Sequence, residues 1–287
     1  MKKSGVFALV LLIGPMVSNA QGLYVDVNVG YGFPFITQTG ILSNNTYVSY
    51  SNYDNNDFYS SYTDEAVALS LGKGVNFGAS IGYMFNLHIG AEFQLSYLVG
   101  GKTEGTYSDQ ATYISGGITD MYTSSGTTTF SSNFFRAIPT IVLAAGTEKL
   151  NPYAKLGLVV GFGKINITDV SNISGDKQSY AAELNGGVSL GLNTRLGIEF
   201  GATANMKYFA EINIVSMNYS PKKGMIIEYK LNGVDMTNSL TTSEREVEFV
   251  DEVTFSESTP DNEPSQQLKM HMPFGSVGLN FGVRIAL

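Results

Sequence analysis

The sequence predicts an all-β fold, an eight-stranded antiparallel transmembrane β-barrel with long extracellular loops. Three observations support this prediction. Apolar residues recur at every second position in eight segments, which is typical of strands with two unlike faces. No apolar run after residue 20 is long enough for a membrane-spanning helix. The connections between the eight segments include three short and four long ones, and membrane barrels place their long loops on the outer side.

The clearest of these segments is the last one, 277–287. Its apolar positions alternate with small or polar residues, and they are Val277, Leu279, Phe281, Val283, Ile285 and Leu287. The segment ends on its apolar face, with no polar tail to cover it. This pattern favours the closing strand of a barrel whose outer wall touches lipid.

Seven further segments show the same alternation, although one is less regular. They are 23–31, 75–85, 87–99, 134–145, 154–163, 180–190 and 195–204. Proline lacks a backbone donor, so we expect a bulge or a missing ladder bond at Pro139. Short turns are expected at Asn86, 146–151 and 193–194. The remaining connections, predicted as outer loops, are 33–74, 100–129, 164–179 and 205–272.

The N-terminus has the composition of an export signal. Lys2 and Lys3 precede an apolar core, and Ser18-Asn19-Ala20 has the small-residue pattern of a cleavage site. A membrane anchor is the alternative, but the apolar run is short for a span. We therefore predict a cleaved signal at 1–20 and one β-domain at 21–287.

Overall composition excludes several classes of protein. The chain has no cysteine, which excludes a disulfide framework. Its net charge of −8 argues against nucleic acid as a partner.

Charged side chains fall on the polar, inward face of the predicted strands. This set consists of Asp26, Glu92, Arg136, Lys155, Glu183, Glu199 and Arg284. An eight-stranded barrel is filled by its own side chains, and buried charges must be paired. We therefore predict a charge network that plugs the lumen. A gated ion or proton path is the alternative.

Catalytic and metal chemistry have little support in the sequence. The only histidines are His88 and His271, which are far apart in the chain. His271 with a nearby serine could form a nucleophile–base pair, but a solvated histidine at a strand end explains the residue better. We predict no enzyme, no cofactor and no metal centre.

Two of the predicted outer loops have unusual compositions. The first is rich in tyrosine, with Tyr47, Tyr50, Tyr53, Tyr59 and Tyr62 among Ser, Asn and Asp. Such residues occur in binding loops, and they also pack across paired strands. The last loop is acidic, and Glu244, Glu246 and Glu248 would share one face of a strand. They are interpreted either as a solvated edge or as a divalent-cation site that bridges to lipopolysaccharide or to a partner.

Together these patterns resemble the eight-stranded outer-membrane barrels of the OmpA/OmpX type over residues 22–287. The resemblance implies an integral protein of the Gram-negative outer membrane with both termini periplasmic. Its partners would be outer-membrane lipid, lipopolysaccharide and the barrel assembly machinery, which would read Phe281, Val283, Ile285 and Leu287 as a C-terminal signal. The expected function is structural, with exposed loops for recognition or adhesion to an extracellular partner. A narrow porin-like channel and an outer-leaflet lipid-modifying enzyme are the alternatives.

Overall fold

The computed structural model describes residues 22–35, 37–147, 149–201, 203, 205–253 and 260–287. The predicted export signal at 1–20 lies outside these residues. Within the described part of the chain, no helix has the length and apolar composition needed to cross a bilayer. The only helices there are the one-turn η1 (Thr237–Ser239) and α1 (Thr242–Arg245), and almost all other ordered elements are strands.

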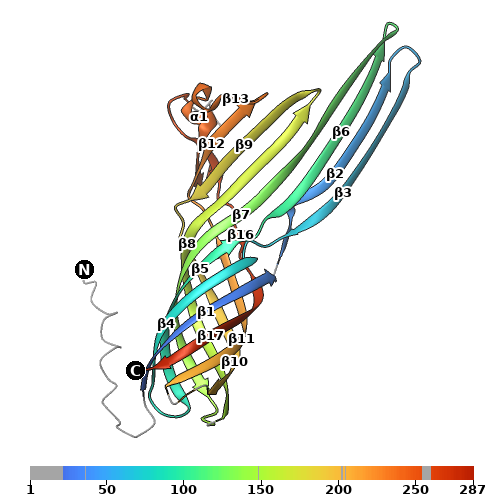
Figure 1. Cartoon of the computed structure of the whole chain (residues 1–287). Coiled ribbons are helices and arrows are strands. Elements are labelled where there is room, and N and C mark those ends of the chain that lie inside the picture. Colours follow the sequence, from blue (N-terminus) through green and yellow to red (C-terminus); the bar gives the residue numbers. More distant parts are fainter. Residues whose placement is uncertain (1–21, 36, 148, 202, 204, 254–259) are drawn as a thin grey trace.

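Eight strands pair with one another in a closed antiparallel ring (Figure 1). In ring order they are β1 (Gly22–Pro34), β4 (Gly74–Met84), β5 (Ile89–Gly100), β7 (Ile118–Ala144), β8 (Leu150–Ile173), β10 (Ser189–Gly201), β11 (Met206–Tyr219) and β17 (Ser276–Ala286). The first and last strands close the ring, with Tyr24 opposite Ala286. We refer to these eight strands as the ring.

Strands β7 and β8 continue well beyond the ring and carry a second set of strands, the upper sheet (Figure 1). On the β7 side follow β6 (Thr103–Ser115), β2 (Gln38–Asn52) and β3 (Asp57–Leu69). On the β8 side follow β9 (Asp176–Asn185), β12 (Lys223–Leu231), β14 (Glu246–Val250) and β15 (Ser265–Leu268). Short strand β13 (Val234–Asp235) pairs with β12, whereas β16 (Met272–Pro273) pairs with the end of β11 in the ring.

The prediction of an eight-stranded antiparallel barrel is therefore wrong. All strands belong to one mixed sheet of seventeen, in which β2–β6 and β14–β15 are parallel pairs. The description as a small, porin-like outer-membrane barrel fails with it. The segments predicted as outer loops are rich in Tyr and Thr, which favour strands, and their backbone groups pair with those of their neighbours.

Individual strands also differ from the predictions. The segment 180–190 is not one strand, because β9 ends at Asn185 and β10 begins at Ser189. The turn expected at 193–194 lies in the middle of β10, and β11 was assigned to a loop. Around Pro139 the β7–β8 register keeps the same offset, since Ala137 lies opposite Val160 and Thr140 lies opposite Gly157. The two residue pairs between these positions are missing. A lost ladder bond, rather than a bulge, accommodates the proline.

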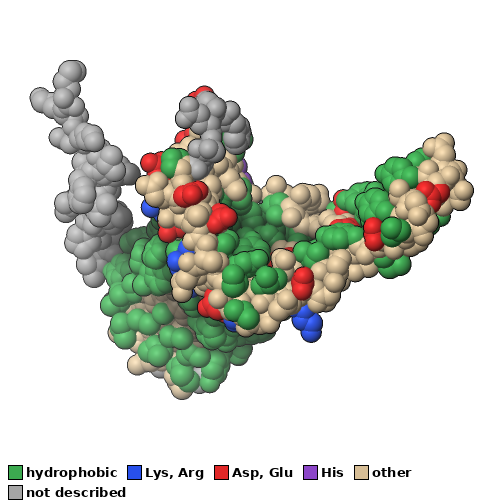
Figure 2. Space-filling view, turned by 90° about the horizontal axis from the view of Figure 1, so that it is seen from above, with side chains coloured by type: hydrophobic (Ala, Val, Ile, Leu, Met, Phe, Trp, Pro, Cys, Tyr) green, Lys and Arg blue, Asp and Glu red, His purple; other side chains and the backbone are tan. Residues whose placement is uncertain are grey.

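The ring has an apolar outer wall and a polar interior. On β8, Leu156 and Leu158 are 58% and 61% exposed, whereas Lys155 before them and Val159 after them are buried. The same alternation runs through β1, β4, β5, β10 and β17. Seen from above, hydrophobic side chains cover the outer surface of the ring (Figure 2).

The buried apolar core lies where the ring meets the upper sheet. Its centre is Phe134 on β7, whose ring centroid is 4.6 Å from that of Phe274 and 5.0 Å from that of Tyr219. Leu71 and Leu98 are also fully buried in this cluster. The cluster therefore forms an apolar layer across the upper end of the ring.

We expect Phe134→Ala to lower the free energy of unfolding by about 3–5 kcal/mol, because it leaves a cavity among side chains that cannot close over it. Denaturant titration of the protein in detergent micelles measures the change. Phe58→Ala is the control, since Phe58 is 55% exposed on the upper sheet. Equal losses in the two variants would contradict the central position of Phe134.

Candidate functional site

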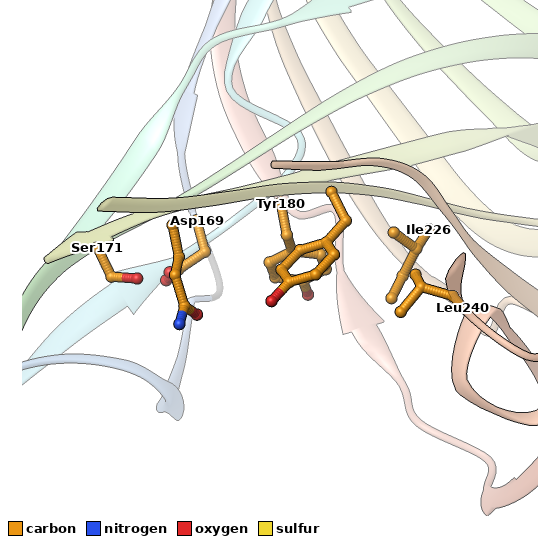
Figure 3. Close-up of a pocket in the computed structure, with 7 residues that line it drawn as sticks. Asp169, Ser171, Tyr180, Ile226 and Leu240 are labelled. Atoms are coloured by element: carbon orange, nitrogen blue, oxygen red, sulfur yellow. The ribbon is translucent and has the colours of Figure 1, made fainter. Parts of the chain in front are cut away.

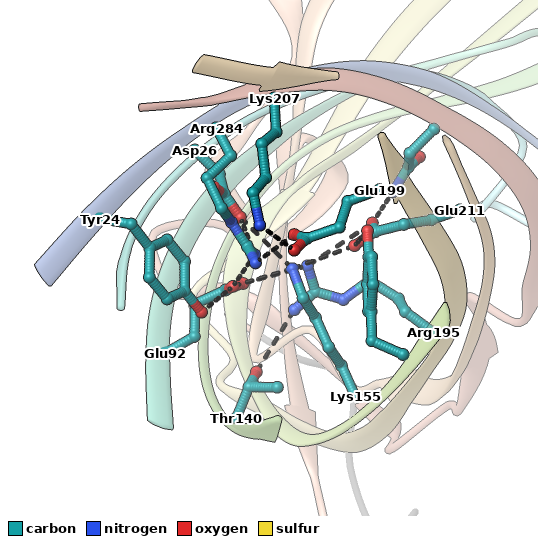
Figure 4. A network of polar contacts seen from close by, with 12 residues as sticks. Tyr24, Asp26, Glu92, Thr140, Lys155, Arg195, Glu199, Lys207, Glu211 and Arg284 are labelled. Atoms are coloured by element: carbon teal, nitrogen blue, oxygen red, sulfur yellow. Dashed lines mark hydrogen bonds and ion pairs between the residues drawn. The ribbon is translucent and has the colours of Figure 1, made fainter. Parts of the chain in front are cut away.

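The interior of the ring contains a cluster of four carboxylates and four cations, the charge cluster (Figure 4). Its members are Asp26, Glu92, Glu199 and Glu211 with Lys155, Arg195, Lys207 and Arg284. Seven strands contribute: β1, β5, β7 through Thr140, β8, β10, β11 and β17. Alternation places these residues on the inward face of neighbouring strands, since paired residues share a face.

Lys155 is the centre of the charge cluster. Its ammonium lies 2.8 Å from Glu92 Oε2, 3.0 Å from Glu211 Oε1 and 3.4 Å from Asp26 Oδ2. These side chains are at most 1% exposed. This single buried cation thus links its own strand, β8, to three other strands. Charges so enclosed are tolerated only when they are paired and hydrogen-bonded.

Arg284 supplies the second centre. Its Nε and Nη2 each donate to Asp26 at 2.8 Å, a two-pronged pairing, and Nη1 donates to Glu199 at 2.7 Å. The guanidinium also lies 3.8 Å from the centroid of the Tyr24 ring. Planar guanidinium groups favour both kinds of contact. The last strand of the ring is therefore tied to β1 and β10 by side chains as well as by backbone.

Hydroxyl groups complete the hydrogen bonding of the acids. Tyr24 donates to Glu92 at 3.1 Å, and Tyr153 donates to Glu211 at 2.9 Å. Arg195 donates to Thr140 Oγ1 at 3.3 Å and to Glu92 at 3.3 Å. The charge cluster is consequently a connected network rather than a set of separate ion pairs.

The inward positions of β7 show how the interior is layered. Moving toward the upper sheet, Thr140 contacts the charge cluster, Arg136 follows, and Phe134 then enters the apolar layer. Arg136 is fully buried, donates to Ser96 at 3.1 Å and also bonds Asn76. Among the described residues it has no carboxylate partner. Buried charged, polar and apolar side chains thus fill the ring together.

Five of the seven charged residues predicted for the interior come together in the charge cluster: Asp26, Glu92, Lys155, Glu199 and Arg284. Arg136 lies inside but outside the ion pairs. Glu183 is not in the ring at all; it lies on β9 and pairs with Lys164 at 2.6 Å in the half-exposed upper sheet. The pairing with Lys164 and a hydrogen bond from Asn185 lower the pKa of Glu183.

The sequence reasoning missed Arg195, Glu211 and Lys207. Arg195 precedes Glu199 by four residues on one strand, so the alternation already placed both on the inward face. Glu211 and Lys207 lie on β11, which had been assigned to a loop. The alternation of Ala210, Ile212 and Ile214 with Glu211 and Asn213 does indicate a strand within the predicted loop, but it does not show that this strand belongs to the ring.

The predicted tyrosine loop forms the β2–β3 hairpin of the upper sheet. Tyr47 lies opposite Tyr62, and Tyr50 lies opposite Tyr59, so these rings are neighbours across the two strands. Tyr53 and Tyr59 are both 60% exposed, and Tyr62 is 62% exposed. Tyr53, the fifth tyrosine of the predicted loop, is the first residue of the turn between β2 and β3.

The tips of two hairpins are fastened together by one carboxylate. Asp54, in the β2–β3 turn, accepts hydrogen bonds from the backbone N–H of Gly116 at 2.7 Å and of Gly117 at 2.9 Å. Both glycines have positive φ, as the two-residue turn between β6 and β7 requires. These backbone donors lower the pKa of Asp54. The far end of the upper sheet is therefore held as one unit.

The other residues considered for chemistry lie apart from the charge cluster. His271 Nδ1 is 2.7 Å from Ser220 Oγ, and among the described residues no carboxylate orients this histidine. His88 lies in the β4–β5 turn, with Nδ1 3.2 Å from the carbonyl oxygen of Ala144. Within the described ranges, no group of three or more acidic or histidine side chains could hold a metal ion.

The acidic face predicted for Glu244, Glu246 and Glu248 does not form. Glu244 lies in α1, where it completes a capping box with Thr241. Glu246 and Glu248 follow on β14, and Glu248 lies 3.6 Å from Lys223. Because the three carboxylates belong to a helix and a strand, they do not form the predicted cation site.

No protein-family model matches the chain, and no curated protein matches it either. The resemblance to the OmpA/OmpX type, including an assembly signal at Phe281, Val283, Ile285 and Leu287, therefore stays a prediction. In the structure Phe281, Val283 and Ile285 lie on β17 and Leu287 directly follows it; Phe281, Ile285 and Leu287 are exposed on the outer wall of the ring.

Lys155→Gln should lower the free energy of unfolding by about 3–5 kcal/mol, since it leaves the acids around it without their central cation. Lys164→Gln is the matched control, because its pair with Glu183 is partly solvated and contributes below about 1 kcal/mol. Denaturant titration at neutral pH compares the two variants. A Lys155 variant as stable as the control would contradict the role of the charge cluster.

Acidification should release the Asp54 carboxylate from the two glycines. Because its pKa is lowered in the folded protein, the stabilisation is present above the ordinary pKa of aspartate and is lost as the pH falls through the lowered value. The amide resonances of Gly116 and Gly117 should shift in a pH titration by NMR. In Asp54→Ala the same resonances should not titrate, and a titration that persists would assign it to another group.

Proposed function

We propose that the protein is a membrane-anchored recognition protein. Its ring lies in lipid, its interior is sealed, and its upper sheet presents a binding surface in water. This proposal rests on one observation. The ring reverses the usual arrangement of a protein in water, because charged side chains are buried inside while Val, Leu, Ile and Phe side chains cover the outside. Folded proteins in water expose large apolar patches rarely, and lipid is the surrounding that such a wall fits.

The ends of the ring indicate how the protein would be oriented. Gly22 at the start of β1 and Leu287 lie at one end, where the backbone N–H of Leu287 donates to the carbonyl of Leu23. The short connections 85–88 and 145–149 lie at this end as well (Figure 1). The upper sheet projects from the opposite end. In the proposed arrangement, export places the two ends of the ring on opposite sides of the membrane.

A solute channel finds less support than a sealed anchor. Apart from Lys207, whose side chain is 38% exposed, the charge cluster is buried, and so are Arg136 and the apolar layer around Phe134. An enzyme finds little support either, because the Ser220–His271 pair has no third group among the described residues. Recognition by a rigidly held surface remains the function that fits best.

Purified protein mixed with phospholipid vesicles should float with them in a density gradient and should give no stepwise conductance in planar bilayers. The first result follows from the apolar wall and the second from the sealed interior. Flotation is the control for the conductance measurement, because an absence of conductance is informative only when the protein is inserted in the membrane. Failure to float would contradict the anchor, and steady conductance steps would contradict the seal.

A further inference from the structure

The inner face of the ring continues upward onto the open upper sheet. Even-numbered residues of β7, from Arg136 through Phe134 to Phe130, are buried inside, and Thr128 follows on the same face. On β8 the odd-numbered Ile165 is followed in the same way by Asp169. Register then aligns Thr128, Asp169, Tyr180 and Tyr229 across β7, β8, β9 and β12. One continuous surface thus leads away from the sealed ring.

A cavity of about 310 Å³ lies on this surface (Figure 3). Tyr180 and Tyr229 supply aromatic walls, Ile226 and Leu240 an apolar end, and Asp169 with Ser171 and Gln178 a polar end. Leu240 follows η1, so the connection after β12 forms part of the wall. The volume suits one long side chain rather than a large ligand.

The Asp169 carboxylate is fixed in place but has no cation. Thr128 Oγ1 donates to Oδ2 at 2.6 Å, and the Tyr107 hydroxyl donates to Oδ1 at 3.4 Å. No ion pair to Asp169 occurs among the described residues. Arg245, a basic side chain of this part of the sheet, donates to the carbonyl of Ile226 and lines the adjacent cavity with Glu244 and Glu246. An oriented, half-buried carboxylate is therefore left to meet a positive charge from outside.

Burial raises the pKa of the Tyr180 hydroxyl, and the charge of Asp169 raises it further. Both effects keep this phenol neutral. A neutral tyrosine retains the electron-rich face that attracts ammonium and guanidinium groups. The two aromatic walls and the carboxylate therefore favour the same kind of ligand, a long side chain that ends in a cation.

The β7 side of the upper sheet has the matching charge. Segments 38–69 and 103–130, which we call the arm, contain no Lys or Arg. They contain seven acids, which are Asp54, Asp57, Asp64, Glu65, Glu104, Asp109 and Asp120. Acidic side chains are visible along the arm in Figure 2. Such a surface attracts a basic partner and repels nucleic acid or anionic headgroups.

We propose that the upper sheet binds a basic segment of another polypeptide, with one Lys or Arg side chain in the cavity formed by Asp169, Tyr180 and Tyr229. The acidic arm steers the segment, and the cavity fixes its register. This inference rests on the proposed recognition function and names its partner class. It is independent of the membrane anchor, which the flotation experiment tests separately.

The test uses the full chain in uncharged detergent micelles and a fluorescent twelve-residue peptide of alternating Lys and Ser. A peptide of alternating Glu and Ser is the control ligand. Fluorescence anisotropy should show binding of the Lys peptide only, with an affinity that falls as salt is raised. No binding of the Lys peptide, or equal binding of the two peptides, would overturn the proposal.

Asp169→Asn should weaken binding of the Lys peptide about tenfold, since the amide keeps an acceptor for Thr128 but loses the charge. Glu228→Gln is the matched control. It removes one negative charge beside Tyr229 on the opposite face of β12, and the affinity should stay within about twofold of wild type. Equal affinities of wild type and Asp169→Asn would overturn the assignment of the cavity.

Two further measurements keep the outcome decisive. Tyr229→Leu preserves an apolar wall and should weaken binding of the Lys peptide about threefold, because the aromatic face is lost. This variant tests whether the cavity binds the peptide if Asp169→Asn does not fold. An unchanged affinity in a folded Tyr229→Leu variant would count against the cavity. Spermidine should compete only weakly with the Lys peptide. If spermidine bound as tightly as the peptide, the proposed polypeptide partner would be wrong and a small amine would be the ligand.

Discussion

The charge cluster is the interaction on which the rest of the structure depends. Lys155, Arg195 and Arg284 are held inside the ring by acids from β1, β5, β10 and β11. None of these strands could present a charged inward face without the others, because an unpaired buried charge costs several kcal/mol. Ring closure and charge pairing therefore require each other. Pairing of β1 with β17, which are far apart in sequence, brings Arg284 to Asp26.

The two long strands carry this order outward. β7 and β8 pair along nearly their full lengths, from Ala144 opposite Tyr153 to Ser124 opposite Ile173. Their lower halves belong to the ring and their upper halves to the upper sheet. The apolar layer around Phe134 lies at the transition. A lower part filled with buried side chains therefore holds a sheet whose inner face is open, which is the arrangement expected for the proposed recognition surface.

Local patterns in the sequence predicted much of the ring and little of the upper sheet. Strict alternation identified β1, β4, β5 and β17, because one face of each is apolar and the other polar. The pattern could not separate β9 from β10, since residues 180–190 keep their alternation across the loop at 186–188. Nor could it reveal the parallel β2–β6 pair, because pairing partners far apart in sequence leave no periodic signal. The same limit explains why Glu183 was wrongly predicted inside the ring. Its strand, β9, pairs with β8 and β12 in the upper sheet.

The most direct test of the central claim, an apolar wall in lipid around a charged interior, is a comparison of two single-tryptophan variants. The chain has no tryptophan, so each variant reports from one position. Leu158→Trp places the indole on the outer wall of the ring, and Ile118→Trp places it at the far end of the upper sheet. In vesicles of lipids with brominated acyl chains, fluorescence at 158 should be quenched and fluorescence at 118 should not, while aqueous iodide should give the reverse. Quenching of both positions by iodide alone would contradict the account.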